Sequence, residues 1–120
     1  MTFQFAADLE AEVLVLSGRD RVDLMTRGAE VRRMLASAPD LVDLAYTLNC
    51  APGGPAATRL TIVATSVTDL DRKLALALDR LADPVCRCIE ERSGVYYTET
   101  PLYTPGALAF LFPGQGAQYP

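Results

Sequence analysis

Histidine and tryptophan are absent from this chain of 120 residues, and lysine occurs only once, at Lys73. Without histidine, the chain cannot form the Ser–His or Cys–His pair that activates the nucleophile of many hydrolases and transferases. Cysteine is scarce too, and the odd number of thiols (Cys50, Cys86 and Cys88) indicates no disulfide framework. Structural zinc needs four nitrogen or sulfur ligands, so we expect reduced thiols and no metal. A complete histidine-dependent enzyme is therefore excluded unless another chain or domain supplies the base.

Long apolar runs and an excess of basic charge are also missing. No run approaches the ~20 residues of a membrane-spanning helix, and the N-terminus lacks the basic and apolar regions of a secretory signal. The net charge of -4 argues against a nucleic-acid partner, because phosphate binding needs a basic patch. We therefore expect no nucleic acid, no membrane and a cytoplasmic location. Arginine strongly outnumbers lysine, which is common in high-GC bacteria. The composition, 50% hydrophobic and 22% charged, is that of an ordinary globular domain.

Three segments have the patterns of β-strands. Val13–Leu16 is a short apolar run, and Arg59–Thr65 alternates between two faces, which is the clearest strand signal in the chain. Gly94–Thr98 predicts a third strand. Neighbouring residues of a strand point to opposite faces, so one ring of Tyr96 and Tyr97 should lie in the core and the other should be partly exposed.

Three further segments have the spacing of amphipathic helices. The first, 20–37, carries one apolar stripe: Leu24, Gly28, Val31 and Leu35. The second runs from an N-cap at Asp40 to a stop at Asn49. The third has Thr68 as its N-cap, ends near Asp83 and carries the stripe Leu70, Leu74, Ala77, Leu78 and Leu81. The segment 85–93 is ambiguous, and a short helix is one interpretation of it. Three strands with helices on one face predict a small two-layer α/β or α+β domain.

The C-terminal segment has the most specific pattern in the sequence. Ala107–Phe112 is an unbroken apolar run, typical of a strand that is buried on both faces. A Pro-Gly-Gln-Gly turn follows it, formed by residues 113–116. Many α/β enzymes use a buried strand and a glycine-rich turn to present backbone N–H groups to an anion. An apolar strand should not remain in water, so we expect the run 107–112 to be covered.

These residues resemble a known family. Phe110–Tyr119 is similar to the start of the malonyl-CoA:acyl carrier protein transacylase fold, as found in polyketide synthases. Val13–Ser17 and Asp43–Asn49 resemble the linker domain that joins ketosynthase to acyltransferase in these synthases, and the resemblance covers nearly the whole chain. Gly94–Tyr97 is faintly similar to the iterative, enediyne-type or polyunsaturated-chain synthases, with an ordinary modular synthase as the other possibility.

The resemblance implies a division into a linker domain (1–100), a short linker (101–106) and a truncated start of the acyltransferase (107–120). The linker domain would have a three-stranded antiparallel sheet with helices on one face and no active site. The acyltransferase of the family loads a malonyl-type unit from coenzyme A onto a serine and passes it to the phosphopantetheine thiol of a carrier protein. Gln115 corresponds to a residue of its oxyanion hole, and Gly114 and Gly116 allow close approach of the backbone to the substrate.

The partners implied are the ketosynthase and acyltransferase domains of the same synthase, the acyl carrier protein, and a separate chain if the rest of the acyltransferase lies on one. No cofactor is expected in this chain. The nucleophile motif Gly-His-Ser-x-Gly and the base histidine are missing, so the chain alone is catalytically incomplete. The alternative is a free-standing α+β module that binds a small molecule or regulates. The terminal motif favours the synthase, because such a module has no need of an oxyanion turn. The extender unit, the product and the oligomeric state are not encoded here.

Overall fold

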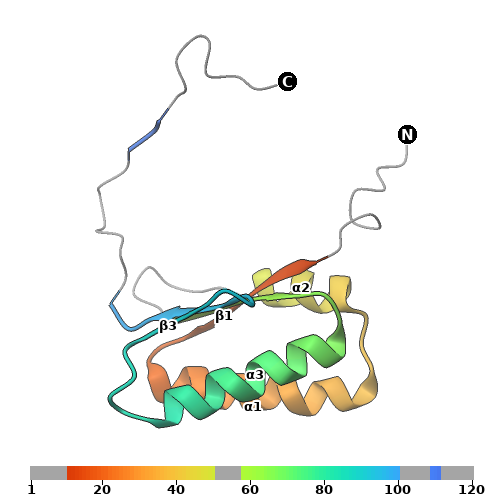
Figure 1. The fold of residues 1–120 in the computed structure, drawn as a ribbon. Coiled ribbons are helices and arrows are strands. Elements are labelled where there is room, and N and C mark those ends of the chain that lie inside the picture. The colour runs from red at the N-terminus through yellow and green to blue at the C-terminus, as the bar shows by residue number, and fades with distance from the viewer. Residues whose placement is uncertain (1–10, 51–57, 101–108, 112–120) are drawn as a thin grey trace.

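The computed structural model describes residues 11–50, 58–100 and 109–111. Four strands form one antiparallel sheet in the order β1-β2-β4-β3. Helices α1 and α3 pack side by side on one face of the sheet, and α2 lies beside β1 (Figure 1). The predicted mixed α/β class, with an antiparallel sheet and helices, is confirmed. The elements follow one another as β1 (Glu12–Gly18), α1 (Arg21–Met34), the 3-10 turn η1 (Leu35–Ser37), α2 (Leu41–Asn49), β2 (Thr58–Ala64), α3 (Val67–Ala82), β3 (Cys88–Glu91) and β4 (Val95–Thr98).

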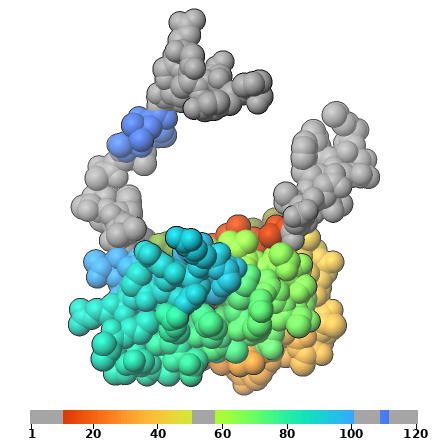
Figure 2. All heavy atoms as spheres, viewed as in Figure 1, coloured from red at the N-terminus to blue at the C-terminus, as the bar shows by residue number. Residues whose placement is uncertain are grey.

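The core lies between the sheet and the helices α1 and α3, and Leu44 and Ala45 of α2 join it. Every second strand residue faces these helices, and the stripe predicted for the first helix is buried, as are most members of the stripe of α3. Tyr97 is buried and Tyr96 is 44% exposed, so the two rings divide between the faces as expected. Gly28 gives α1 and α3 room to approach, since a Cβ there would lie 2.9 Å from Leu78 Cδ2. The described residues 11–50 and 58–100 form one continuous body (Figure 2).

The sheet has four strands where the sequence predicted three. The segment interpreted as a short helix contains β3, which pairs with β4 and places Ile89 in the core. Gly94 closes the hairpin between them with φ +113, a conformation that other residues rarely adopt. Only one residue of β3 is a buried apolar residue, so the strand has almost no periodic signal.

The N-cap of α3 is Ser66, and the prediction of Thr68 is wrong. Ser66 Oγ accepts from the N–H of Asp69 at 3.0 Å, and Asp69 Oδ2 accepts from the N–H of Thr65 at 3.1 Å. These reciprocal bonds satisfy two donors at the helix start. Both Ser66 and Thr68 have an aspartate three positions later, so the sequence pattern fits either residue. The predicted N-cap Asp40 of α2 is confirmed, since its carboxylate accepts from the N–H of Val42 at 2.9 Å.

Residues 109–111 form no strand and are exposed, with Phe110 at 74% and Leu111 at 95%. The expectation that the run 107–112 is covered is therefore wrong for these three residues. The described sheet consists of β1, β2, β4 and β3, and residues 109–111 are not part of it. The rest of the run lies outside the described residues. Among the described helices, none is long and apolar enough to cross a membrane.

Candidate functional site

The face of the sheet opposite α1 and α3 is a largely uncharged surface. It presents apolar and hydroxyl side chains from three neighbouring strands, and Val13 and Tyr96 are 48% and 44% exposed. Its central residues are Val13, Val15, Thr61, Val63, Tyr96 and Thr98. Two exposed charged residues share this face: Arg59 lies opposite Ser17 near the start of β2, and Glu90 of β3 lies opposite Tyr96. This open face of the sheet is the best candidate for contact with another domain.

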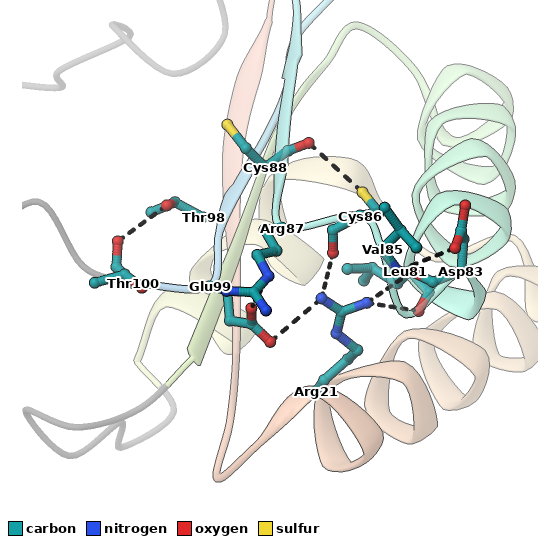
Figure 3. Close-up of polar contacts among 10 residues, drawn as sticks. All are labelled: Arg21, Leu81, Asp83, Val85, Cys86, Arg87, Cys88, Thr98, Glu99 and Thr100. Carbon is teal, nitrogen blue, oxygen red and sulfur yellow. Dashed lines mark hydrogen bonds and ion pairs between the residues drawn. The ribbon is translucent and has the colours of Figure 1, made fainter.

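Arg21 organises a second polar region, where the chain leaves β4 (Figure 3). Its guanidinium donates to the carbonyl oxygens of Leu81 (3.3 Å), Asp83 (2.8 Å) and Cys86, and it pairs with Glu99 Oε1 at 3.3 Å. The side chain is only 16% exposed. A cation in the first turn of a helix is unfavourable next to the positive end of the helix dipole. That unfavourable position is the one sequence signal that points to a tertiary role, and sequence reasoning missed it.

Tyr97 lies beneath this region. The guanidinium carbon of Arg21 is 5.9 Å from the centre of its ring, within range of a cation–π contact. The hydroxyl is buried and has no hydrogen-bond partner among the described residues. Burial raises the pKa of the phenol, so Tyr97 remains neutral and serves as a core residue.

Asn49 connects α2 to the edge of the sheet. Its side-chain oxygen accepts from Val15 N–H, and its side-chain nitrogen donates to Val13 C=O, both at 2.9 Å. The amide thus occupies the place of a neighbouring strand along β1, which is an edge strand. The helix stop expected at Asn49 is confirmed, since α2 ends there. The contact with β1 spans 34 to 36 residues and has no local signal in the sequence.

Replacing Asn49 by alanine should lower the free energy of unfolding by about 1 kcal/mol, because water replaces both lost bonds at this exposed edge. Urea denaturation measures the loss, and amide exchange should quicken at Val15. Thr47→Ala is the matched control on the same helix, since Thr47 bonds only within its own helix, to Asp43 C=O. Equal stability losses in the two variants would refute the role of Asn49.

Lys73 and Asp69 form an ion pair that is almost enclosed by the fold. Lys73 Nζ lies 2.8 Å from Asp69 Oδ2 and 2.7 Å from Val63 C=O, and the two side chains are 10% and 11% exposed. The hydrogen bond from Lys73 holds the pKa of Asp69 well below its usual range. A salt bridge with Arg72 at 2.6 Å completes the pairing of the carboxylate. The single carboxylate thus pairs with two cations, of which Arg72 is exposed to solvent, and the enclosed Lys73–Asp69 contact is typical of a structural ion pair.

The described residues contain no catalytic constellation. No group of three or more metal-ligating side chains occurs among them, and Cys50, Cys86 and Cys88 are free thiols. A small pocket of about 140 Å³ lies between β1, α1 and α2 and is lined by Val15, Leu16, Ser17, Arg27, Glu30, Val31, Met34 and Leu48. Small-molecule sites usually measure about 300–1,000 Å³, so this pocket is too small for a typical substrate.

The predicted site residues Gly114, Gln115 and Gly116 lie outside the described residues. Their roles remain predictions. The boundaries placed at 100 and 106 likewise remain predictions.

Comparison with known proteins identifies a shared fold. The chain is similar to a crystal structure of the acyltransferase domain of the iterative polyketide synthase in enediyne biosynthesis, a study that addressed the basis of its substrate specificity. The TM-score is 0.67 and the identity is 24%, over 75% of this chain and 25% of the other. No family model and no curated protein matches the sequence. The chain thus has the fold of about a quarter of that larger protein, and this likeness concerns the fold alone.

Proposed function

We propose that this chain is the spacer domain of a polyketide synthase of the iterative, enediyne type, followed by the first residues of its acyltransferase. The observation that carries the proposal is the likeness of fold to part of an acyltransferase domain, in a chain whose C-terminal segment reads Phe-Pro-Gly-Gln-Gly. The likeness of fold and the C-terminal motif are separate observations, because the first concerns the shape of the backbone and the second a short run of side chains. In this role the domain performs no chemistry and fixes the position of the acyltransferase relative to the ketosynthase.

The acyltransferase would transfer malonyl-type units from coenzyme A to the phosphopantetheine thiol of an acyl carrier protein. Gln115 would donate to the oxyanion of the tetrahedral intermediate, and Gly114 and Gly116 would let the backbone approach the acyl group. A single donor of this kind contributes roughly 3–4 kcal/mol to the stability of a transition state. The serine nucleophile and the histidine base would come from the acyltransferase body that follows in the same polypeptide or on a second chain.

The open face of the sheet is the surface that we assign to contact with this acyltransferase body. The helical side of the domain carries charges that already pair with one another, such as Arg32 with Asp71 at 2.8 Å and Arg80 with Glu91. The open face instead presents Val13, Val63 and Tyr96, which suit an uncharged partner surface. Its occupant should be apolar and hydroxyl-rich, without a strong charge of either sign.

Acyl loading tests the proposal. The 120-residue chain and a longer protein that extends through a Gly-His-Ser-x-Gly motif are incubated with radiolabelled malonyl-CoA. We expect a covalent acyl group on the longer protein only, because the nucleophile is missing from the short chain. Acylation of the short chain, or none on a folded long chain, would contradict the proposal.

Two substitutions at Gln115 in the longer protein test the oxyanion role. Gln115→Pro removes the backbone N–H and should slow acylation by roughly 10²–10³. Gln115→Ala keeps this donor and is the matched control, with a smaller loss. Malonyl-CoA binding, measured separately, shows whether the proline variant remains folded.

The small-molecule-binding or regulatory module remains the second candidate. Among the described residues, the pocket of about 140 Å³ beside β1 is smaller than such ligands need, and the two larger hollows of about 300 and 340 Å³ are shallow surface depressions beside the exposed pair Arg32–Asp71. No observation therefore favours this function over the spacer.

A further inference from the structure

The residues that end β4 are held from several sides. Glu99 follows this strand directly, and its N–H donates to Arg87 C=O at 2.9 Å. Its carboxylate lies 3.3 Å from the guanidinium of Arg21 and 3.6 Å from Nε of Arg87. Beside it, Thr98 Oγ1 donates to Thr100 C=O at 2.9 Å. The direction in which the chain leaves the sheet is therefore fixed by contacts with α1 and with the segment before β3 (Figure 3).

Arg21 is the residue that joins these segments. It stands at the start of α1, and its acceptors lie 60 to 78 residues further along the chain. The carbonyls of Leu81 and Asp83 belong to the end of α3, where helix carbonyls lack partners within the helix and the dipole is negative. The planar guanidinium can bind these carbonyls and Glu99 at once, because its five donors diverge in a fixed fork. A lysine ammonium at this position could not reach all of them.

We infer that Arg21 is a positioning residue that sets the direction of the chain at Glu99 and Thr100, where it leaves β4. The helix contacts of Arg21 anchor its guanidinium, and the anchored guanidinium holds Glu99. A domain that follows this segment would be attached to the sheet through this anchored exit. The inference rests on the proposed function only for the identity of that domain, since the contacts themselves lie within the described residues.

The contact with Glu99 should matter for orientation more than for stability. The carboxylate of Glu99 is 42% exposed, and ion pairs at such positions contribute about 0–1 kcal/mol. Glu99→Gln therefore removes the charge at the exit and leaves the carbonyl contacts of Arg21 in place. Glu91→Gln is the matched control, because Glu91 pairs with Arg80 at a similar exposure and lies away from the exit.

Nuclear magnetic resonance of the 120-residue chain tests the inference. Residual dipolar couplings report the orientation of each N–H bond, which a change in stability alone does not alter. In the wild type, the couplings of Glu99 and Thr100 should fit the same alignment as the couplings of the core. In Glu99→Gln and in Arg21→Lys they should depart from it, while those of Glu91→Gln remain as in the wild type.

Amide exchange gives a second reading of the same contact. The Glu99 amide should exchange up to about fivefold faster in Glu99→Gln, relative to core amides of the same sample, which corresponds to about 1 kcal/mol of local opening. Unchanged couplings and unchanged exchange at Glu99 and Thr100 in Glu99→Gln would overturn the inference. This variant keeps the test valid even if Arg21→Lys fails to fold.

A longer protein with the following domain separates this inference from the proposed function. If both are correct, Glu99→Gln should load the acyl group at the wild-type rate and pass it to the carrier protein severalfold more slowly. If loading never occurs but the couplings change as expected, the proposed function fails and the role of Arg21 stands. Normal transfer despite altered couplings would show that the direction of the chain at Glu99 and Thr100 has no effect on the following domain. That result would overturn the link between Arg21 and the following domain.

Discussion

Replacing Asp69 by alanine is expected to lower the free energy of unfolding by about 3 kcal/mol, because it leaves the ammonium of Lys73 enclosed without its counter-ion. Lys73 is 8% exposed, and its other bond goes to the neutral carbonyl of Val63. Small domains have only about 5–15 kcal/mol of stability, so the loss is severe. Urea denaturation measures it. Asp71→Ala is the control: Asp71 pairs with Arg32 at an exposed site and should cost at most about 1 kcal/mol.

The combination of Asp69→Ala with Lys73→Met should recover part of the loss, because no enclosed charge then remains. If the double variant lost as much free energy of unfolding as the two single variants lose together, the pairing would be contradicted.

The same carboxylate makes stability depend on pH. The folded-state pKa of Asp69 is depressed, first by its hydrogen bond to Lys73, so the pair stabilises the fold fully above the unfolded-state pKa of about 4. This contribution to stability is lost as the pH falls from about 5 toward the depressed folded-state pKa. Asp69→Asn should flatten this acid slope. A residual slope is expected from Asp23, whose pKa is lowered first by the N–H of Arg19.

Gly94→Ala should cost about 3 kcal/mol, through backbone strain and a steric clash together. The φ of +113 is strained for any residue with a side chain, and a Cβ would lie 2.8 Å from Val63 O and 2.9 Å from Val63 Cβ. Val63 cannot retreat freely, because its N–H donates to Gly94 C=O at 2.8 Å. Thermal or urea unfolding measures the cost.

Ser93→Ala, at the neighbouring exposed position of the hairpin, should change stability by less than about 0.5 kcal/mol. A tolerated alanine at position 94 would show that the hairpin adopts another turn.

The sequence was informative wherever a periodic pattern was long. The stripe of α1 and the alternation of β2 predicted both elements and the residues that they bury, because burial on one face imposes the period directly. β3 was missed because Ile89 is its only buried residue, and its pairing with β4 comes from tertiary structure. The cap at Ser66 was missed because Thr68 satisfies the same local pattern.

The polar contacts of the candidate sites were beyond sequence reasoning for a different reason. Arg21 meets acceptors 60 to 78 residues away, and Asn49 meets β1 across 34 to 36 residues. Such contacts follow only from the packed arrangement of helices on the sheet. In contrast, the oxyanion role of Gln115 came from a local motif alone and remains a prediction.

Mass spectrometry of the protein from its source cells tests the spacer function most directly. Peptides are sequenced across Pro120, and the intact mass is compared with the 13.0 kDa of this chain. The spacer function predicts a larger polypeptide, or a tightly bound second chain, that continues from this segment into a Gly-His-Ser-x-Gly motif. A native polypeptide of 13.0 kDa that purifies without any such chain would contradict it.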